Sequence, residues 1–141
     1  MSRAPLLLGL LAALAACTAD PGARVLEHHG RWESGYGVEF FNVVGRLRNT
    51  SGRALAYVKL RLEAVDAQGE VVASTDAYNE SAEALAVPDL DAQAKAGLQQ
   101  RLKPIPSHGE ERFRGSFLKD ETPPFTDYRV VVVETPAAPR P

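Results

Sequence analysis

The sequence predicts a mainly β fold, an antiparallel β-sandwich into which one short helix is inserted. The composition, 45% hydrophobic and 24% charged over 141 residues, is ordinary for one globular domain with a sizeable core. Apolar and charged side chains alternate through the middle of the chain, and turn motifs typical of β-hairpins separate such segments. One segment lacks this alternation and shows helical spacing instead.

The central strand is predicted between residues 58 and 66, where side chains alternate between two faces. One face is apolar and the other charged: Val58, Leu60, Leu62 and Ala64 against Lys59, Arg61 and Glu63. A period of two is that of a strand with one face in a core and the other in water. Burying the three larger apolar side chains contributes roughly 1.5–3 kcal/mol each, so this strand is expected to form the centre of the fold.

A strand over residues 40–49 is predicted to precede it. Val43, Gly45 and Leu47 fall on one face and Arg46 and Arg48 on the other. The turn Asn49–Gly52 has Asn first and Gly fourth, as a type I turn followed by a left-handed Gly requires. We therefore expect the two strands to pair antiparallel as a hairpin.

Three further strands are predicted along the chain. The turn Asp66–Gly69 repeats the same chemistry and predicts a second hairpin, with its outgoing strand over residues 70–78. Two more strands are expected over 112–118 and 128–134. The tail, 135–141, has three prolines in seven residues and is expected to be disordered.

The segment from residue 79 to residue 103 looks inserted and predicts a helix after Pro88. Apolar residues recur there every four positions, at Leu90, Ala94, Leu98 and Leu102, and Asp89 is the expected N-cap. The final strand is apolar on both faces, and a sandwich normally leaves one face wet. The stripe of Leu90, Leu98 and Leu102 would cover its Val131 and Val133, or else a partner protein would. We favour coverage by the stripe, because two exposed apolar surfaces would invite aggregation.

Residues 1–16 predict a signal peptide, with Arg3 at a charged start and an apolar run too short to span a bilayer stably. Leu14, Ala15, Ala16 and Cys17 resemble the lipobox of bacterial lipoproteins, in which the cysteine is acylated and freed by cleavage before it. Two or three acyl chains anchor a protein stably in a membrane. The alternative is an ordinary secretory signal with an incidental cysteine. Thr18 after the cysteine resembles an outer-membrane address, so we expect a lipid-anchored envelope protein facing the periplasm.

Residues 17–37 mix Gly, Pro and polar side chains and are expected to be the lipidated cysteine and a tether, with Val25 and Leu26 as a candidate short first strand. Trp32, Tyr36, Phe40 and Phe41 are expected to cap one end of the core, with a ligand platform as the alternative. No metal site is expected at His28 and His29, because adjacent side chains on an extended chain point to opposite sides.

The segment GRLRNTSGRALAYVKLRLEAVDAQGEVV resembles the FxLYD domain of bacterial lipoproteins and cell-envelope proteins. The matching features are a strand end, a long strand closing in Asp, a Gly turn and a Pro-Gly segment before a Phe-rich strand: Gly45, Leu47 and Asn49, then Leu62 to Asp66, Gly69, Pro106 to Gly109, Phe113 and Phe117. Ala64 and Val65 stand where the family has Leu-Tyr, and 79–103 is an insertion. The resemblance covers about residues 38–134 and implies an immunoglobulin-like β-sandwich with no catalytic residues.

Several function classes are not expected. A basic stripe with interleaved aromatics, which nucleic-acid binding would want, does not occur, and neither do a nucleophile elbow, a phosphate loop or zinc spacing. We therefore expect no enzyme activity and no cofactor. The expected function is a non-catalytic interaction or accessory module with an envelope protein partner, and Leu90, Leu98, Leu102, Trp32 and Tyr36 are the candidate surface residues. The alternative is a small-molecule or glycan-binding lipoprotein.

Overall fold

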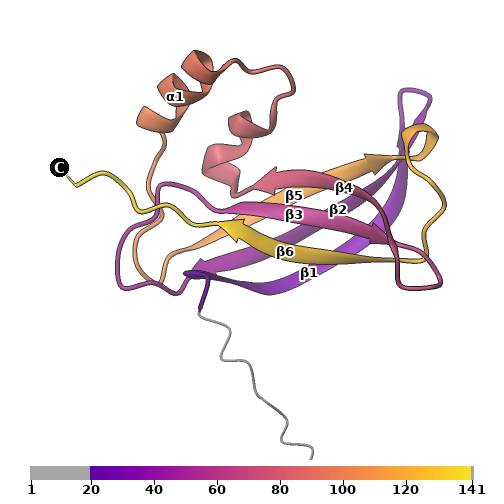
Figure 1. Ribbon diagram of the computed structural model, residues 1–141, viewed down its shortest axis with the longest axis horizontal. Helices are drawn as coiled ribbons and strands as arrows, with labels where there is room; N and C mark the ends of the chain where they lie inside the picture. The colour runs from indigo at the N-terminus through magenta and orange to yellow at the C-terminus, as the bar shows by residue number, and fades with distance from the viewer. Residues whose placement is uncertain (1–19, 141) are drawn as a thin grey trace, which may run out of the picture.

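The computed structural model describes residues 20–140 and confirms a mainly β fold, in which two three-stranded antiparallel sheets pack face to face (Figure 1). The first sheet has the order β1 (Ala23–Gly35), β2 (Val38–Asn49), β5 (Glu110–Leu118). The second has the order β4 (Val71–Tyr78), β3 (Lys59–Val65), β6 (Asp127–Glu134). The short helices are η1 (Glu80–Ala86), α1 (Ala92–Gln100) and η2 (Lys119–Glu121).

The strand order is that of an immunoglobulin-like sandwich, as predicted. The chain crosses between the sheets after β2, after β4 and after β5. In the immunoglobulin fold, strands A, B and E share one sheet, and C′, C and F belong to the other. The six strands here occupy those places in chain order. β3 is the central strand of its sheet, because both β4 and β6 pair with it.

The sandwich has two distinct ends. At one end, here called the tip, lie the β1–β2 turn, the β3–β4 turn and η2 (Figure 1). At the other end, the base, lie Asp20, the β2–β3 connection, the segment before β5 and the C-terminal tail.

The core between the sheets is built from the alternating apolar faces that the sequence indicates. Val43 and Leu47 of β2 meet Leu60 and Leu62 of β3, and all four are fully buried. Gly45 lies between the two β2 residues, where a side chain would meet the Glu27 carbonyl and the Phe113 ring. The close approach explains why this position of the strand is a glycine.

The predicted hairpin across the turn Asn49–Gly52 is wrong, because β2 and β3 lie in different sheets. The Asn49 side chain is buried, and its Nδ2 donates to the carbonyls of Arg53, Ile105 and Pro106 at 2.8, 2.9 and 3.1 Å. Its Oδ1 accepts from the Ser51 amide and hydroxyl at 2.9 and 2.6 Å. These bonds turn the chain away from β2, and residues 50–58 then carry it to the second sheet.

The other predicted turn, Asp66–Gly69, does close a hairpin between β3 and β4. The Asp66 carboxylate accepts from the amides of Gln68 and Glu70, both at 2.9 Å, and Gly69 adopts φ +81°. The predicted strands over 70–78, 112–118 and 128–134 are confirmed as β4, β5 and β6.

The predicted tether is wrong for residues 23–35, which form β1 and pair with β2 along its length. Beyond Val25 and Leu26, the polar outward face and the glycines of this segment give a weak strand signal in the sequence. Pairing with β2, not intrinsic strand propensity, stabilises it as a strand. The prediction of a disordered tail is wrong as well. Ala137 bridges Leu55, and the Ala138 amide donates to the Ala54 carbonyl at 2.9 Å.

The insert does contain a helix, but it begins after Asp91, whose carboxylate accepts from the Ala94 amide at 2.7 Å. Asp89, the predicted cap, has φ +67° in the turn before it. Leu98 and Leu102 pack on a second apolar cluster formed by Tyr57, Tyr78, Ala82 and Leu85. Coverage of the final strand by the insert is therefore wrong, and Val131 remains 39% exposed.

Candidate functional site

The predicted lipidation site, Cys17, and the cleavage motif Leu14, Ala15 and Ala16 lie outside the described residues. The described chain starts at Asp20, whose carboxylate accepts from the Gly22 amide at 2.9 Å and the Thr50 hydroxyl at 3.1 Å. The hydrogen bond to Thr50 therefore holds Asp20 at the base of the sandwich.

An aromatic cluster forms between the two sheets near the tip. Trp32 of β1 and Phe41 of β2 belong to it, as predicted, with ring centroids 5.4 Å apart. Phe125, from the loop before β6, packs on both at 5.5 and 5.2 Å. Sequence reasoning missed Phe125, although a single aromatic after two prolines in a polar loop is a usable signal. Trp32 is half exposed, so the cluster closes the core and also reaches the surface.

Tyr36 does not join this cluster. It lies in the β1–β2 turn with φ +53° and is fully exposed. Val38, Leu118 and Trp32 are further exposed apolar residues toward the same end of the sandwich, at 42%, 39% and 50%. The tip therefore carries several apolar side chains in water.

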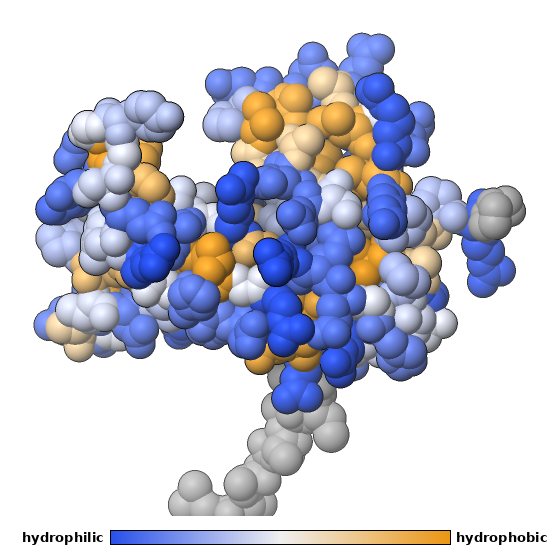
Figure 2. Space-filling model, turned by 180° about the vertical axis from the view of Figure 1, so that it is seen from behind, coloured by the Kyte–Doolittle hydropathy of each residue, from blue (hydrophilic) through white to orange (hydrophobic). Residues whose placement is uncertain are grey.

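The insert places its predicted leucines in two different settings. Leu98 and Leu102 are half-buried against the second cluster, whereas Leu90 precedes α1 and is not part of that cluster. Seen from behind, apolar side chains gather over the insert, above a mostly polar sheet face (Figure 2). The three leucines therefore do not form one continuous stripe.

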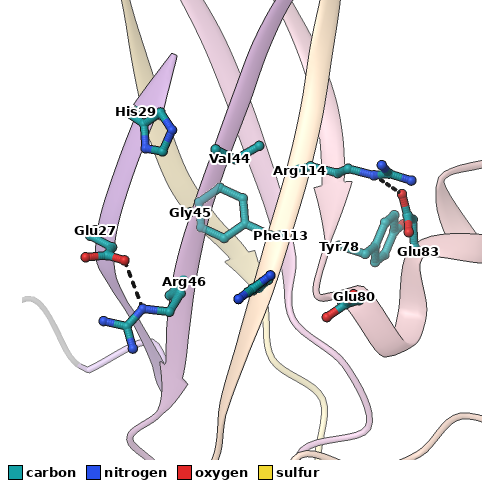
Figure 3. A pocket seen from close by; sticks show the side chains of 11 residues that line it. Glu27, His29, Val44, Gly45, Arg46, Tyr78, Glu80, Glu83, Phe113 and Arg114 are labelled. Carbon is teal, nitrogen blue, oxygen red and sulfur yellow. Dashed lines mark hydrogen bonds and ion pairs between the residues drawn. The ribbon is translucent and has the colours of Figure 1, made fainter. Parts of the chain in front are cut away.

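A groove of about 760 Å³ lies on the outer face of the first sheet (Figure 3). Its floor is formed by outward side chains of β2 and β5, including Val44, Arg46, Arg112 and Arg114. Glu80 and Glu83 of η1 form one wall. Three guanidinium groups and several carboxylates thus line one depression.

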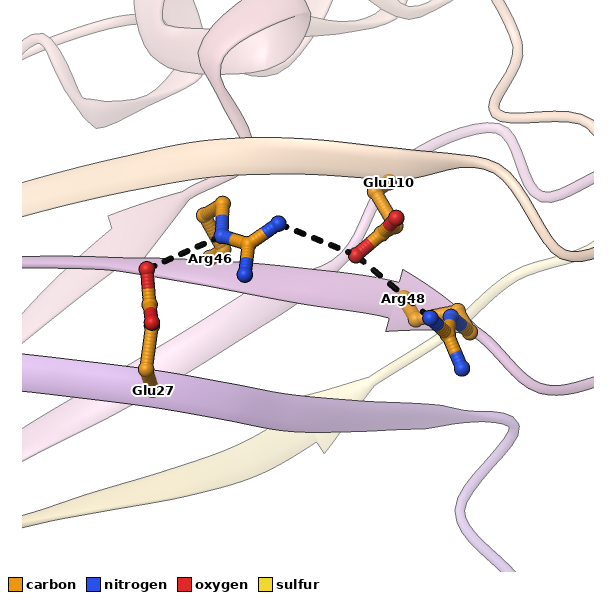
Figure 4. A network of polar contacts seen from close by, with 4 residues as sticks. All are labelled: Glu27, Arg46, Arg48 and Glu110. Carbon is orange, nitrogen blue, oxygen red and sulfur yellow. Dashed lines mark hydrogen bonds and ion pairs between the residues drawn. The ribbon is translucent and has the colours of Figure 1, made fainter.

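Most of these charges are paired. Arg46 donates to Glu27 at 2.9 Å and to Glu110 at 3.3 Å, and Glu110 also lies 3.6 Å from Arg48 (Figure 4). The hydrogen bond between Arg46 and Glu27 lowers the pKa of Glu27 and raises the pKa of Arg46. Across the groove, Arg114 donates to Glu83 at 2.6 Å, which raises the pKa of Arg114.

Arg112 is the arginine of the groove without an ion pair in residues 20–140. It is exposed, and no carboxylate of residues 20–140 comes within 4.0 Å of its guanidinium nitrogens. Its partner across the β2–β5 ladder is Arg46, and Arg114 lies two residues along its own strand.

The wall of the groove is fixed by Glu111. Its carboxylate accepts from Asn79 Nδ2 and the Ser81 amide at 2.9 Å and from the Ser81 hydroxyl at 3.0 Å. Glu110, the next residue, instead joins the arginine network on the outer face. The two carboxylates thus serve separate roles, and neither faces the other as a catalytic pair would.

The histidines are separated in space. His28 Nδ1 lies 2.7 Å from the Tyr128 hydroxyl, while His29 lines the groove. His108 lies in a turn with φ +65°, and the Ser107 hydroxyl donates to the Ser51 carbonyl at 2.7 Å. Among residues 20–140, no three His, Cys, Asp or Glu side chains gather as metal ligands would.

Over the same part of the chain, no helix has both the length and the apolar character to cross a membrane.

Comparisons with known proteins bring no relative. Neither a protein-family model, nor a curated protein sequence, nor a solved structure matches the chain significantly. The resemblance to the FxLYD domain therefore stays a prediction.

Proposed function

We propose that the protein is a lipid-anchored, non-catalytic interaction module of the bacterial cell envelope. Cys17 would hold it at the outer membrane, facing the periplasm. The observation that carries the proposal is the start of β1 at Ala23, six residues after Cys17. Since a chain spans at most about 3.6 Å per residue, the three residues from Cys17 to the fastened Asp20 reach only about 11 Å. The base of the domain would then rest at the membrane surface.

The tip would face away from the membrane in this arrangement. The 13 residues of β1 rise about 3.3 Å each, so the β1–β2 turn lies about 40 Å from the base. Exposed apolar surface can mark an interaction site when it is contiguous, and this end of the sandwich carries the exposed apolar residues Trp32, Tyr36, Val38 and Leu118. We therefore assign partner binding to the tip. A glycan platform is less well supported, because Phe41 and Phe125 already pack on the Trp32 ring.

The anchor is tested by Cys17→Ser, compared with Ala19→Ser outside the motif. Cells are fed labelled fatty acid and then fractionated. We expect Cys17→Ser to lose both the label and the membrane association, and Ala19→Ser to keep both. Undiminished labelling of Cys17→Ser would refute the lipoprotein proposal.

The binding surface is tested by photo-crosslinking in cells. A photoreactive amino acid is placed at Tyr36 on the tip or at Arg61, an exposed position on β3. Both variants keep Cys17, so they reach the same membrane. We expect a discrete crosslinked complex from position 36 and none from position 61. Equal crosslinking from both positions would contradict partner binding at the tip.

A further inference from the structure

Arg112 occupies an unfavourable place for a residue that serves only the fold. It lies directly opposite Arg46 in the β2–β5 ladder, and like charges opposite each other destabilise a sheet. Arg46 is relieved by Glu27 and Glu110, and Arg114 by Glu83. The guanidinium of Arg112 has no such partner within residues 20–140, so its five donors face solvent inside the groove.

A second charge in the groove is also without an ion pair. Glu80, at the start of η1, is exposed and makes no ion pair within 4.0 Å in the described chain. It lines the same groove as Arg112. Among the charged side chains that line the groove, Arg112 and Glu80 thus make no ion pair within 4.0 Å in residues 20–140, although Glu80 still acts on the more distant charge of Arg114.

We propose that this groove binds a short peptide segment of mixed charge. Arg112 holds a carboxylate of the segment, and Glu80 holds an ammonium or guanidinium group. A guanidinium suits a carboxylate because it donates two parallel hydrogen bonds. A volume of about 760 Å³ is within the range of small-ligand sites and accommodates a few residues. The site is separate from the tip and does not depend on the function proposed above.

The surrounding charges favour a peptide over a phosphate group. Arg46 and Arg114 are already paired with Glu27 and Glu83, so Arg112 is left to compensate a phosphate that carries nearly two negative charges, while Glu80 would repel it. A peptide that carries one carboxylate and one nearby cationic group complements Arg112 and Glu80. Because Glu111 fixes the start of η1 through Ser81 and Asn79, the wall is already formed before a ligand arrives.

The test uses the full-length protein purified in detergent and fluorescein-labelled tetrapeptides. The probes are C-terminally amidated Ala-Glu-Ala-Lys and its analogue Ala-Gln-Ala-Lys, which keeps the Lys but lacks the carboxylate, with binding followed by fluorescence anisotropy. Arg112→Gln is compared with Arg61→Gln, which removes another exposed strand arginine, from the other sheet. We expect Arg112→Gln to weaken binding of the Glu probe about tenfold to a hundredfold. Arg61→Gln should leave it unchanged.

Two further measurements separate this proposal from a structural role and from non-specific attraction. Arg112→Gln should melt no lower than the unchanged protein, because it removes a like-charge contact. Arg112→Glu should prefer a probe with Lys in place of Glu. Failure of the Glu probe to bind, equally tight binding of the Gln analogue, equal loss in Arg61→Gln, or a lowered melting temperature of Arg112→Gln would overturn the proposal. So would competition by inorganic phosphate or phosphatidylglycerol vesicles with no response to the peptides, which would make the site an anion or lipid site instead.

Discussion

Replacing Asn49 by alanine is expected to destabilise the base of the sandwich strongly. The residue is fully buried, and its amide joins the start of the β2–β3 connection to the segment before β5, 56 residues away. Nδ2 bonds the carbonyls of Arg53, Ile105 and Pro106, and Oδ1 holds Ser51. Alanine removes all five hydrogen bonds at once.

The size of the loss in stability depends on which hydrogen bonds the partner carbonyls keep after the substitution. The Ile105 carbonyl still accepts from the Leu55 amide at 2.9 Å, and the Pro106 carbonyl from the Gly109 amide at 2.8 Å. These carbonyls are therefore not left unpaired, and the loss stays near the lower end of about 0.5–1.5 kcal/mol per hydrogen bond. Five such bonds give a loss of about 2–4 kcal/mol, which corresponds to roughly 8–16 °C in melting temperature for a domain of this size.

The assay is urea unfolding followed by circular dichroism, with Asn42→Ala as the control. Asn42 lies on the same strand but makes one long hydrogen bond, to Glu33 at 3.5 Å. We expect the control to lose less than about 0.5 kcal/mol, as surface substitutions usually do. If Asn49→Ala lost no more than Asn42→Ala, the Asn49 network would not be what holds the β2–β3 connection.

Three other substitutions test the core, the insert and the response to pH. Leu60→Asp places an unpaired charge in the core and should abolish the cooperative thermal transition, whereas Arg61→Asp on the outer face should keep it. Leu98→Asp should lower the melting temperature by several degrees, since Leu98 packs on the second cluster; an unchanged melt would contradict that packing. Burial and the hydrogen bond to Glu134 raise the pKa of Tyr57 to about 12 from 10.0. Because the folded pKa is the higher one, this stabilisation is complete below pH 10 and is lost between pH 10 and 12. Urea titrations at pH 9 and 11.5 should show a smaller loss for Tyr57→Phe than for the unchanged protein, and equal losses would contradict the assignment.

The strands could be predicted where the pattern was local. The alternation around Leu60 and Leu62 identifies the central strand without any knowledge of its neighbours. The two Asn/Asp-to-Gly turns show where this approach ends. Asp66 bonds amides inside its own turn, whereas the Asn49 amide reaches the Ile105 carbonyl, 56 residues away. The same Asn/Asp-to-Gly spacing therefore forms a hairpin turn after β3, whereas after β2 it begins the connection that crosses to the other sheet.

The candidate groove could not be predicted from the sequence. Alternation places Arg46 on a wet face, but it says nothing of Arg112, which becomes its neighbour only when β5 pairs with β2. Glu80 reaches the groove only because Glu111 fixes the start of η1. Each residue reads as solvated charge in the sequence, and their juxtaposition is a property of the topology.

The fastening of the tail to the base has a consequence for how the chain can fold. Leu55 bridges both Ile105 and Ala137, and the Thr135 hydroxyl donates to the Pro21 carbonyl, which is 114 residues earlier. Contacts between such distant residues form slowly, because a large loop must close before they form. The central strand β3 also lacks one neighbour until β6 is present. A chain that folds from its N-terminus onward would therefore stay incomplete until β6 and residues 135–138 are available, and its exposed Leu60 and Leu62 would need protection during that interval.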